Sequence, residues 1–575
     1  MRPRYAPTEE QQAIIERSGS AFVVACPGAG KTRTMVERAF RVLKGKNDRR
    51  GIALVSFTNA AVEELGQSLR RCGILPAPLF PSFIGTFDRF LWQFLIAPFG
   101  IPGVSALPVL IPDKSEWEIK PFPTAQSLPL NCFDRTTAKC DPNLAKQFGF
   151  DVTKRSVASH ESSVKTIVRR AMDRGHIDFE DVRDFVKHRL KDVVFAKRVS
   201  AALAARFQEI VVDEAQDCNP EDIAIVEWLR KAGIALKIIC DPNQSIYKFR
   251  GGVTDELLKC ERTFAEGERM RMSGNFRSTP AICSAIVSLR APHLRDNPDQ
   301  ACGQYKDDPT PVYLLSYPGT TIPSSIGKRF REIVEGAGIS VEDSPVVASV
   351  RATASKAIGR ASISDTGHKT LVLAEATMNY HYAFGAGNRR TALENLHRVL
   401  LFVGGQINSC GNYDSYVVEM DLANGSWRPE VIALANALKF RDGMVVEEWL
   451  RNARVVLQPW LAEGVNVNQR LKWSNKLASA LACVPDDSLS AHTIHSVKGA
   501  EFPAICVVMT VPKAGAILDF LEGNAGNDAG EDARRIYVGA SRAERVLALA
   551  VPKSRADRLL ALLTCYGSSV ELYEI

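Results

Sequence analysis

The sequence predicts an α/β fold in which two lobes, each built on a parallel β-sheet, carry one helical insertion apiece. Three observations support this prediction. Apolar runs of strand length alternate with segments of helical spacing in two separate regions of the chain. A glycine-rich turn, Ala25–Thr32, joins the first of these runs to a helical segment. A long stretch of helical pattern interrupts each region, which predicts an insertion in each lobe.

The composition is typical of a globular protein with several domains. The chain has 575 residues, of which 46% are hydrophobic and 24% charged, and these values exclude a disordered protein. A net charge of +7 over this length favours a polyanionic partner only weakly. The thirteen cysteines include no Cys-x-x-Cys pair, which is typical of reduced thiols. Because we find no signal peptide and no membrane-spanning apolar run, we expect a cytoplasmic protein without a membrane partner.

Each of the two regions contains four apolar runs that we expect to form strands. Helix-length segments separate the runs, so the strands should pair in parallel and carry helices on both faces of each sheet. The expected strands are Phe22–Ala25, Gly51–Ser56, Glu209–Val212 and Leu236–Cys240 in the first region, and Val312–Tyr317, Pro345–Val350, Ile505–Met509 and Val546–Val551 in the second.

The strand runs and the two interrupting stretches divide the chain into four parts. Segments such as Val164–Met172 in the first stretch and Glu447–Leu457 in the second have helical spacing. The expected parts are a first lobe at 1–90 and 196–280, its helical insertion at 91–195, a second lobe at 281–384 and 486–575, and its helical insertion at 385–485.

The glycine-rich turn Ala25-Cys-Pro-Gly-Ala-Gly-Lys31-Thr32 has the context of a phosphate-binding loop, because it lies between an apolar strand and a helical segment. Backbone amides of Gly28, Ala29 and Gly30 can surround phosphate oxygens, helped by the dipole of the following helix. Lys31 can reach the outer phosphates, and Thr32 can bind Mg²⁺. The strict pattern has glycine where Ala25 stands, and a turn that binds nothing is the alternative.

A second candidate site lies at the end of the apolar run Ile210–Val212, where Asp213 and Glu214 follow directly. An aspartate at the carboxyl end of a strand can hold the Mg²⁺ that bridges nucleotide phosphates. The neighbouring glutamate can orient and deprotonate the attacking water. A strand followed by an acidic helix cap is the alternative. Together with Lys31 upstream, the pair favours nucleotide hydrolysis.

Ordered islands of sequence resemble the superfamily-1 DNA helicases of the UvrD/Rep/PcrA type over nearly the whole chain. The islands include Pro7–Gln11, Asp241–Gly251 with its Gln-Ser-Ile-Tyr core, Ser273–Ser278, Thr493–Phe502 and Tyr537–Ala543. The resemblance implies two RecA-like lobes that bind ATP and Mg²⁺ between them. A P-loop kinase is a poor alternative, since it leaves Asp241–Gly251 and Tyr537–Ala543 without a role.

The resemblance also assigns nucleotide-binding roles. Gln11 and Phe276 are expected to hold the adenine, and Glu501 lies in a motif that touches the ribose. Gln244, Arg277 and Arg542 are expected to sense the γ-phosphate, and Glu214 to act as the base. An arginine delivered from a second lobe can be worth about 10³–10⁵ in rate.

The DNA contacts implied by the resemblance come from both lobes. Phe249 is expected to stack on bases, which contributes about 1–3 kcal/mol per base for any sequence. Burial in the core is the alternative for Tyr247. For His495 we prefer a structural or DNA-contact role, since Glu214 fills the position of the base. The expected DNA-contact residues are Phe57, Thr58, Asn59, Thr86, Phe87, Tyr247, Phe249, Arg250 and His495.

Several departures from the family pattern bear on function. Cys26-Pro27 replaces the usual Gly-Ala, and Phe276 and Phe249 stand where Tyr and Trp are common. The second insertion is shorter than in the large family members. The complete motif set favours an ATP-dependent translocase or helicase on single-stranded or tailed duplex DNA, for which the resemblance implies 3′→5′ travel, whereas the short insertion slightly favours the alternative. The alternative is a DNA-sensing ATPase that regulates a partner nuclease of the OLD type, as in Gabija-type anti-phage systems.

Overall fold

The structure is a computed structural model. It describes residues 6–575 except for 45–47, 74–78, 112, 154–155, 247–253, 296–297, 360–367, 386–388, 408–412, 414–415, 418–419, 421, 423–424, 442, 482–488 and 525–528.

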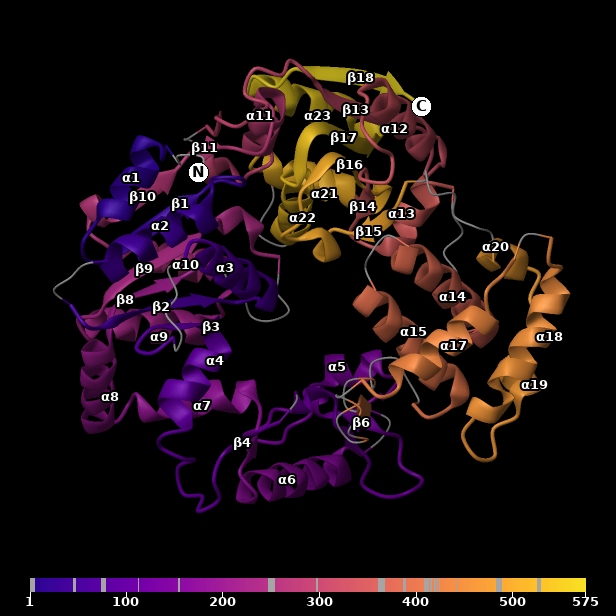
Figure 1. Ribbon diagram of the computed structural model, residues 1–575, viewed down its shortest axis with the longest axis horizontal. Coiled ribbons are helices and arrows are strands. Elements are labelled where there is room, and N and C mark those ends of the chain that lie inside the picture. The colour runs from indigo at the N-terminus through magenta and orange to yellow at the C-terminus, as the bar shows by residue number, and fades with distance from the viewer. Residues whose placement is uncertain are drawn as a thin grey trace.

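The first lobe is built on a six-stranded sheet in which every strand pair is parallel, with strand order β10-β1-β9-β8-β2-β3. Helices α1 and α2 and helices α9 and α10 belong to the same lobe, which is indigo and magenta in Figure 1. The strands are β1 (Ala21–Ala25), β2 (Gly51–Ser56), β3 (Phe83–Thr86), β8 (Phe207–Val212), β9 (Ala235–Cys240) and β10 (Arg269–Met272). The helices of this lobe include α1 (Glu9–Glu16), α2 (Lys31–Lys44), α3 (Asn59–Arg71), α9 (Pro220–Lys231) and α10 (Thr254–Arg262).

The second lobe repeats this architecture with a six-stranded parallel sheet of strand order β15-β14-β16-β17-β13-β18. Its strands are β13 (Val312–Tyr317), β14 (Val346–Ala348), β15 (Ala491–Thr493), β16 (Phe502–Val508), β17 (Ala543–Pro552) and β18 (Val570–Glu574). Its helices include α11 (Pro280–Ser288), α12 (Ser325–Gly336), α13 (Arg351–Ala357), α21 (Val511–Leu521), α22 (Gly530–Ala540) and α23 (Lys553–Cys565). A short pair, β11 (Gly274–Asn275) and β12 (Gln300–Ala301), lies where the chain passes from the first lobe to the second.

Both sheets are covered on two faces. Along β2, Ala53 and Val55 belong to one hydrophobic cluster, whereas the alternate residues Ile52 and Leu54 belong to another. Side chains of a strand point alternately to opposite faces, so two clusters on one strand mean that both faces are buried. Burial on both faces explains why the strands read as continuous apolar runs in the sequence.

The first insertion has a small core of its own. Nine buried residues between Ile119 and Val164 form a separate hydrophobic cluster. By contrast, Leu95 and Val186, which also fall within 91–195, pack in the core of the first lobe. The elements from here to β8 are α4 (Phe87–Leu91), a π-helical turn (Trp92–Ile96), β4 (Val109–Leu110), β5 (Glu118–Ile119), β6 (Leu128–Pro129), α5 (Pro142–Gln147), α6 (Ala158–Asp173), β7 (His176–Ile177), α7 (Phe179–Arg189) and α8 (Val193–Arg206).

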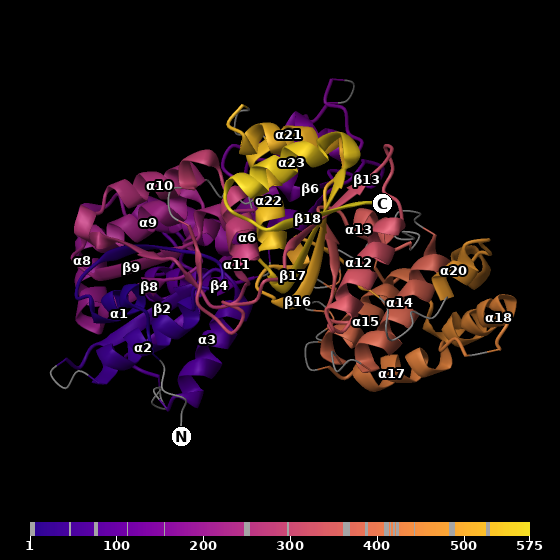
Figure 2. The same ribbon diagram turned by 90° about the horizontal axis from the view of Figure 1, so that it is seen from above.

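The second insertion is helical and forms another separate cluster, built around the buried Trp449. Leu371 of α14 belongs to this cluster, so we place the start of the insertion at α14, before the predicted residue 385. Figure 2 shows these helices grouped at the end of the molecule that is far from the first sheet. They are α14 (Lys369–Gly385), α15 (Arg389–Gly404), α17 (Arg428–Ala437), α18 (Val446–Leu457), α19 (Val467–Arg470) and α20 (Leu477–Leu481).

The predicted fold class is confirmed, because the structure contains two parallel-sheet lobes and each of the eight predicted runs contains or overlaps a strand. Of the helices in the described ranges, none is long and apolar enough to cross a membrane.

Candidate nucleotide site

A cleft of about 850 Å³ lies between the two lobes. The first lobe contributes α1, the glycine-rich loop, the start of α3 and the segments after β8 and β9, and the second contributes residues that precede β16 and β17. The structure therefore brings most of the predicted nucleotide site together. The predicted residues that line the cleft are Gln11, Gly28, Ala29, Gly30, Lys31, Thr32, Thr58, Asp213, Glu214, Gln244, Phe276, Arg277, Glu501 and Arg542.

The glycine-rich loop needs glycine for two reasons. Gly28 and Gly30 adopt φ values of +69° and +70°, a left-handed conformation that other L-residues rarely adopt. A Cβ atom on Gly28 would also lie 2.5 Å from Oδ1 of Asn275 and 2.7 Å from Cβ of Arg277. The N–H of Phe276 donates to the carbonyl of Gly28 at 2.9 Å. The loop is thus packed directly against the segment that leads into the second lobe.

Lys31 forms an ion pair with Glu214, with 2.9 Å between Nζ and Oε1. Burial alone would raise the pKa of Glu214, but the neighbouring Lys31 ammonium outweighs it and holds the pKa below the usual range. The same pairing, against the opposing effect of burial, raises the pKa of Lys31. Both side chains are therefore charged at neutral pH.

Asp213 presents a carboxylate that fits a metal-bound nucleotide. Its Oδ1 is buried and has no hydrogen-bond partner among the residues that the structure describes. Burial and the adjacent Glu214 raise the pKa of Asp213, so a nearby cation would stabilise its charged form. Thr32 lines the same cleft, and its hydroxyl oxygen is a ligand type that Mg²⁺ accepts. Within the described ranges no cluster of three or more His, Cys, Asp or Glu side chains could hold a metal, so substrate phosphates would have to supply further ligands.

Glu214 adopts an unusual backbone conformation, with φ 55° and ψ 36°. A left-handed non-glycine residue is strained by about 1 kcal/mol or more and persists only when its surroundings fix it. Gln216 provides part of that support by donating from Nε2 to the Glu214 carboxylate. Oε1 of Gln216 accepts from the N–H of Asp241 at 3.1 Å. The carboxylate expected to act as the base is therefore connected to the segment that carries Gln244.

Gln244 and Arg542 meet across the cleft, with 3.0 Å between the Arg542 guanidinium and Oε1 of Gln244. The Nε2 group of Gln244 donates to Oδ2 of Asp241 at 2.9 Å, which orients the amide oxygen toward the arginine. Burial and the nearby Arg277 lower the pKa of Arg542 to about 10, so it remains protonated at neutral pH. Two of the three predicted γ-phosphate sensors, one from each lobe, thus contact each other.

Arg277 also lines the cleft and forms an ion pair with Glu501. Its Nε donates to Oε1 of Glu501 at 2.9 Å, and its NH1 donates to the carbonyl of Ser541 at 2.7 Å. Phe276, the residue before it, also lines the cleft. The structure therefore places Phe276, Arg277 and Glu501, which are expected to contact adenine, γ-phosphate and ribose, along the same cleft.

Gln11 is buried against the glycine-rich loop. Its Nε2 donates to the carbonyl of Ala29 at 2.9 Å, and its Oε1 accepts from the N–H of Thr8 at 3.0 Å. The second contact completes a capping box at the start of α1. Gln11 consequently supports the loop conformation in addition to facing the cleft.

Lys498 and Asp217 are site residues to which sequence reasoning gave no role. Lys498, from the second lobe, donates to both carboxylate oxygens of Asp217 at 2.7 Å. Both side chains are buried and both line the cleft. Each lies in a motif that the sequence made visible, but their pairing joins positions 281 residues apart. A single sequence carries no signal for such a contact.

The structure corrects the prediction for Phe87. Its side chain is 1% exposed and belongs to the core of the first lobe, because the chain enters α4 there and turns the ring inward. Phe57 is half-buried and stacks on Phe87, with 5.1 Å between ring centroids. Phe87 therefore supports Phe57 and presents no face for a DNA base.

Thr58 and Thr86 act as helix N-caps in this structure. Their hydroxyl oxygens each accept at 3.2 Å, from the N–H of Ala61 and of Arg89 respectively. Each hydroxyl keeps its own hydrogen as a donor for a phosphate. Asn59 is the first residue of α3. DNA contact by these three residues remains a prediction.

His495 lies between the lobes, with Nε2 3.3 Å from the carbonyl oxygen of Ile246. This contact agrees with a structural role and leaves its DNA contact a prediction. Tyr247, Phe249 and Arg250 follow Ile246 in the chain but lie outside the described residues.

Comparison with known proteins finds a similar family and similar relatives for part of the chain. The UvrD/REP helicase N-terminal domain family matches residues 7–100 and 104–265. PcrA of Staphylococcus aureus (strain Mu50 / ATCC 700699), named an ATP-dependent DNA helicase, is 24% identical over 290 residues, which are 48% of this chain and 39% of that protein. YjcD of Bacillus subtilis (strain 168) is 25% identical over 301 residues, 49% of this chain and 38% of that protein. The chain thus spans about two-fifths of these relatives' length, and the predicted resemblance to UvrD/Rep/PcrA-type helicases is confirmed.

Proposed function

We propose that this chain is an ATP-dependent translocase or helicase on single-stranded DNA, and that it hydrolyses ATP in the cleft between its lobes. One observation carries the proposal: three cationic side chains and a carboxylate base converge on one cleft from two lobes. Lys31 comes from the first lobe, Arg277 from the segment that joins the lobes, and Arg542 from the second. An ATP triphosphate carries the negative charge that such a set of cations suits.

In the proposed reaction, water attacks the γ-phosphate of Mg-bound ATP and the bond to the β-phosphate oxygen breaks. Asp213 and Thr32 would hold the metal of the substrate, and Lys31 would bind the outer phosphates. Glu214 would orient the water and accept its proton. Gln244 would contact the γ-phosphate, while Arg277 and Arg542 would stabilise the negative charge of the transition state.

The ion pair between Lys31 and Glu214 suggests how substrate could activate the base. When phosphates draw the Lys31 ammonium away, the carboxylate loses the neighbour that keeps its pKa low. Its proton affinity then rises toward that of a useful general base. Binding and base activation would thus follow from one displacement of Lys31.

Movement on DNA would follow from changes in the contact between the lobes. Arg542 and Gln244 can touch the same phosphate only while the cleft is closed. Hydrolysis and product release would weaken that closure, so one lobe could shift along a bound strand in each cycle. The direction 3′→5′ is part of the proposal and rests on the resemblance. The name of the Staphylococcus aureus relative, which includes DNA helicase, supports DNA as the partner.

A second candidate function is a DNA-sensing ATPase that controls a partner nuclease of the OLD type in anti-phage defence. The feature that favours it is the short second insertion, whose described helices lie between Lys369 and Leu481. In this alternative, DNA would stimulate ATP turnover while the isolated chain would separate little duplex.

One experiment tests the proposal and separates the two candidates. ATP turnover is measured with and without single-stranded DNA, and strand displacement is measured on duplexes with a 3′ or a 5′ tail. The helicase proposal expects DNA-stimulated turnover and displacement from the 3′-tailed duplex only. Stimulated turnover without displacement would support the second candidate. Turnover that DNA does not change would contradict both.

A further inference from the structure

Asp241 lies at the centre of a buried hydrogen-bond network between the lobes. Its Oδ2 accepts from Nε2 of Gln244 at 2.9 Å and from the hydroxyl of Tyr537 at 2.9 Å. Its Oδ1 accepts from the backbone N–H of Asn243 at 3.0 Å. Tyr537 belongs to α22 of the second lobe, whereas the other groups belong to the first. A residue of one lobe therefore completes the hydrogen bonding of a carboxylate in the other.

Asp241 is well placed to control the orientation of Gln244. A glutamine amide has a donor end and an acceptor end, and rotation by 180° exchanges them. The bond from Nε2 to Asp241 keeps Oε1 of Gln244 directed at Arg542. A rotated Asp241 carboxylate would release the amide, and Oε1 would lose its fixed direction. The direction of Gln244 thus depends on what holds Asp241.

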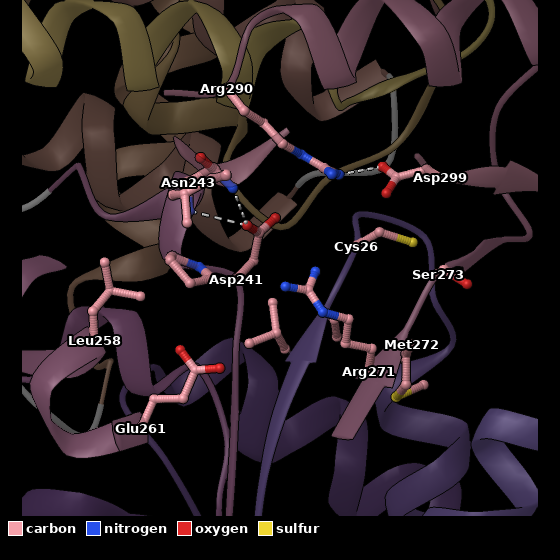
Figure 3. Close-up of a pocket in the computed structure, with 14 residues that line it drawn as sticks. Cys26, Asp241, Asn243, Leu258, Glu261, Arg271, Met272, Ser273, Arg290 and Asp299 are labelled. Atoms are coloured by element: carbon pink, nitrogen blue, oxygen red, sulfur yellow. Dashed lines mark hydrogen bonds and ion pairs between the residues drawn. The ribbon is translucent and has the colours of Figure 1, made fainter. Parts of the chain in front are cut away.

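Within its own lobe, Asn243 holds Oδ1 of Asp241 through its backbone N–H and, at 3.5 Å, through its side-chain amide. Figure 3 shows Asp241 and Asn243 beside a pocket that Cys26 and the Arg290–Asp299 ion pair also line. This pocket has a volume of about 50 Å³, so it has room for water-sized molecules and none for a nucleotide. Asp241 and Tyr537 are both buried. For a buried carboxylate, the loss of one donor has a large effect.

We propose that Tyr537 is a positioning residue, whose hydroxyl fixes Asp241 and thereby orients the Gln244 amide only when the two lobes are in contact. The inference rests on the proposed function and deepens it, because it names the side chain through which contact of the second lobe changes the orientation of Gln244. When the lobes separate, the Tyr537 hydroxyl leaves Asp241 and Gln244 loses its orientation. Hydrolysis is thereby restricted to the closed state.

The substitution Tyr537→Phe tests the inference because it removes only the hydroxyl. The ring keeps its packing, including the Arg290 guanidinium 5.9 Å from its centroid. Tyr317→Phe is the matched control: Tyr317 is also a fully buried residue of the second lobe, and its hydroxyl donates to the carbonyl of Met509 at 2.7 Å, away from the cleft. Each variant loses a buried hydrogen bond of its hydroxyl, and the Tyr537 hydroxyl also interacts with the Arg290 side chain. The Tm values of the two variants are therefore compared first.

The expected result is a split between turnover and binding. Tyr537→Phe should lower kcat for ATP by about tenfold, the effect of losing one positioned hydrogen bond. Its affinity for a non-hydrolysable ATP analogue should stay within about twofold, since Asp241 does not line the cleft. Tyr317→Phe should keep the wild-type kcat. If Tyr537→Phe also kept it, or lost affinity as strongly as turnover, the inference would be overturned.

A second arm asks whether Tyr537 acts through Gln244. In a Gln244→Ala background, Tyr537→Phe should cause no further loss of kcat, because the amide to be oriented is gone. A further tenfold loss there would contradict the inference. If Tyr537→Phe lowers the Tm more than its control, Asp241→Asn replaces it, with the same expected loss of kcat, and wild-type turnover in that variant would overturn the inference. A wild-type chain without ATP turnover would instead overturn the proposed function itself.

Discussion

Each of the three cations expected to meet the phosphates already contacts a protein acceptor. Lys31 pairs with Glu214, Arg277 pairs with Glu501, and Arg542 donates to Gln244. A nucleotide must therefore exchange these contacts for its own phosphates, so part of the binding free energy is offset. The arrangement also keeps cations stable in a partly buried site until a triphosphate arrives.

Lys31→Ala should reduce ATP turnover by at least about a hundredfold, since it removes the positive charge next to the transferred phosphate. It should also raise the pKa of Glu214, which loses its ion-pair partner. The measurement is phosphate release, with circular dichroism to verify folding. Lys259→Ala serves as the control, because Lys259 is exposed and pairs only with Glu256 on α10 among the contacts in the structure. Wild-type turnover by Lys31→Ala would remove Lys31 from the site.

Gly28→Ala should impair both stability and ATP turnover. The new Cβ would be strained at φ +69° and would clash with Asn275 and Arg277. Gly73→Ala is a matched control, because Gly73 has φ +63° but no atom within 4 Å of the position that a Cβ would occupy. Both variants should lose about 1–2 kcal/mol from backbone strain. Thermal unfolding should show a larger loss for Gly28→Ala, and equal losses with unchanged turnover would contradict the packing described here.

At the scale of elements, the ends of strands and the start of a helix position the site. Asp213 follows β8, Asp241 follows β9, and Lys31 begins α2, the helix that comes after β1. Because β1, β9 and β8 are neighbours in one parallel sheet, these three residues lie at the same edge of it. The carboxyl edge of a parallel sheet is where such folds bind ligands. None of the described residues of the helical insertions lines the cleft. Their contribution to stability can therefore be studied separately.

The second insertion contains a buried histidine, His397, from which we predict that the stability of the folded chain falls in acid. His397 is 1% exposed, stacks on Trp427 with 4.0 Å between ring centroids, and has Nδ1 3.0 Å from the Tyr413 hydroxyl. Burial lowers its pKa to about 4, whereas an unfolded histidine has a pKa of about 6.5. Between these values the unfolded chain binds more protons, so stability falls as the pH falls, by about 2 kcal/mol at pH 5.

His397→Phe should reduce the loss of Tm between pH 7 and about pH 5, because a phenyl ring can stack on Trp427 without titrating. His188→Phe is the control, since His188 is exposed on α7 and should leave the loss unchanged. Differential scanning calorimetry at the two pH values measures the effect. Equal losses in the wild type and in His397→Phe would show that His397 does not titrate differently in the folded chain.

Local patterns were sufficient to predict the strands, the glycine-rich loop and the carboxylates after β8, because each depends on neighbouring residues. They were insufficient for contacts between distant segments. The pairing of Lys498 with Asp217 and that of Tyr537 with Asp241 depend on how the lobes meet. Phe87 was wrongly predicted to face DNA, because the sequence between a strand and a helix does not show whether a side chain there points to solvent or into the core. The start of the second insertion was misplaced for a related reason, since helical spacing does not reveal which core a helix joins.

For the whole molecule, the contacts between the lobes concentrate around the cleft. Lys498 pairs with Asp217, Arg534 donates to the carbonyl of Ser245 at 2.7 Å, and Arg542 meets Gln244. Because these contacts are polar and those of Lys498 and Arg542 line the cleft, occupancy of the cleft can change how tightly the lobes associate. This physical coupling is what a translocase requires.

The rate of ATP hydrolysis by the Arg542→Ala variant, compared with that of the wild type, tests most directly whether the second lobe takes part in the reaction. The control is Arg545→Ala, because Arg545 contacts Asp308 and the carbonyl of Ala337 and does not line the cleft. Single-turnover ATP hydrolysis should fall by about 10³ in Arg542→Ala, while affinity for a non-hydrolysable analogue should change by less than about tenfold. Arg545→Ala should hydrolyse ATP at the wild-type rate. Unchanged hydrolysis in Arg542→Ala would contradict a site shared by the two lobes.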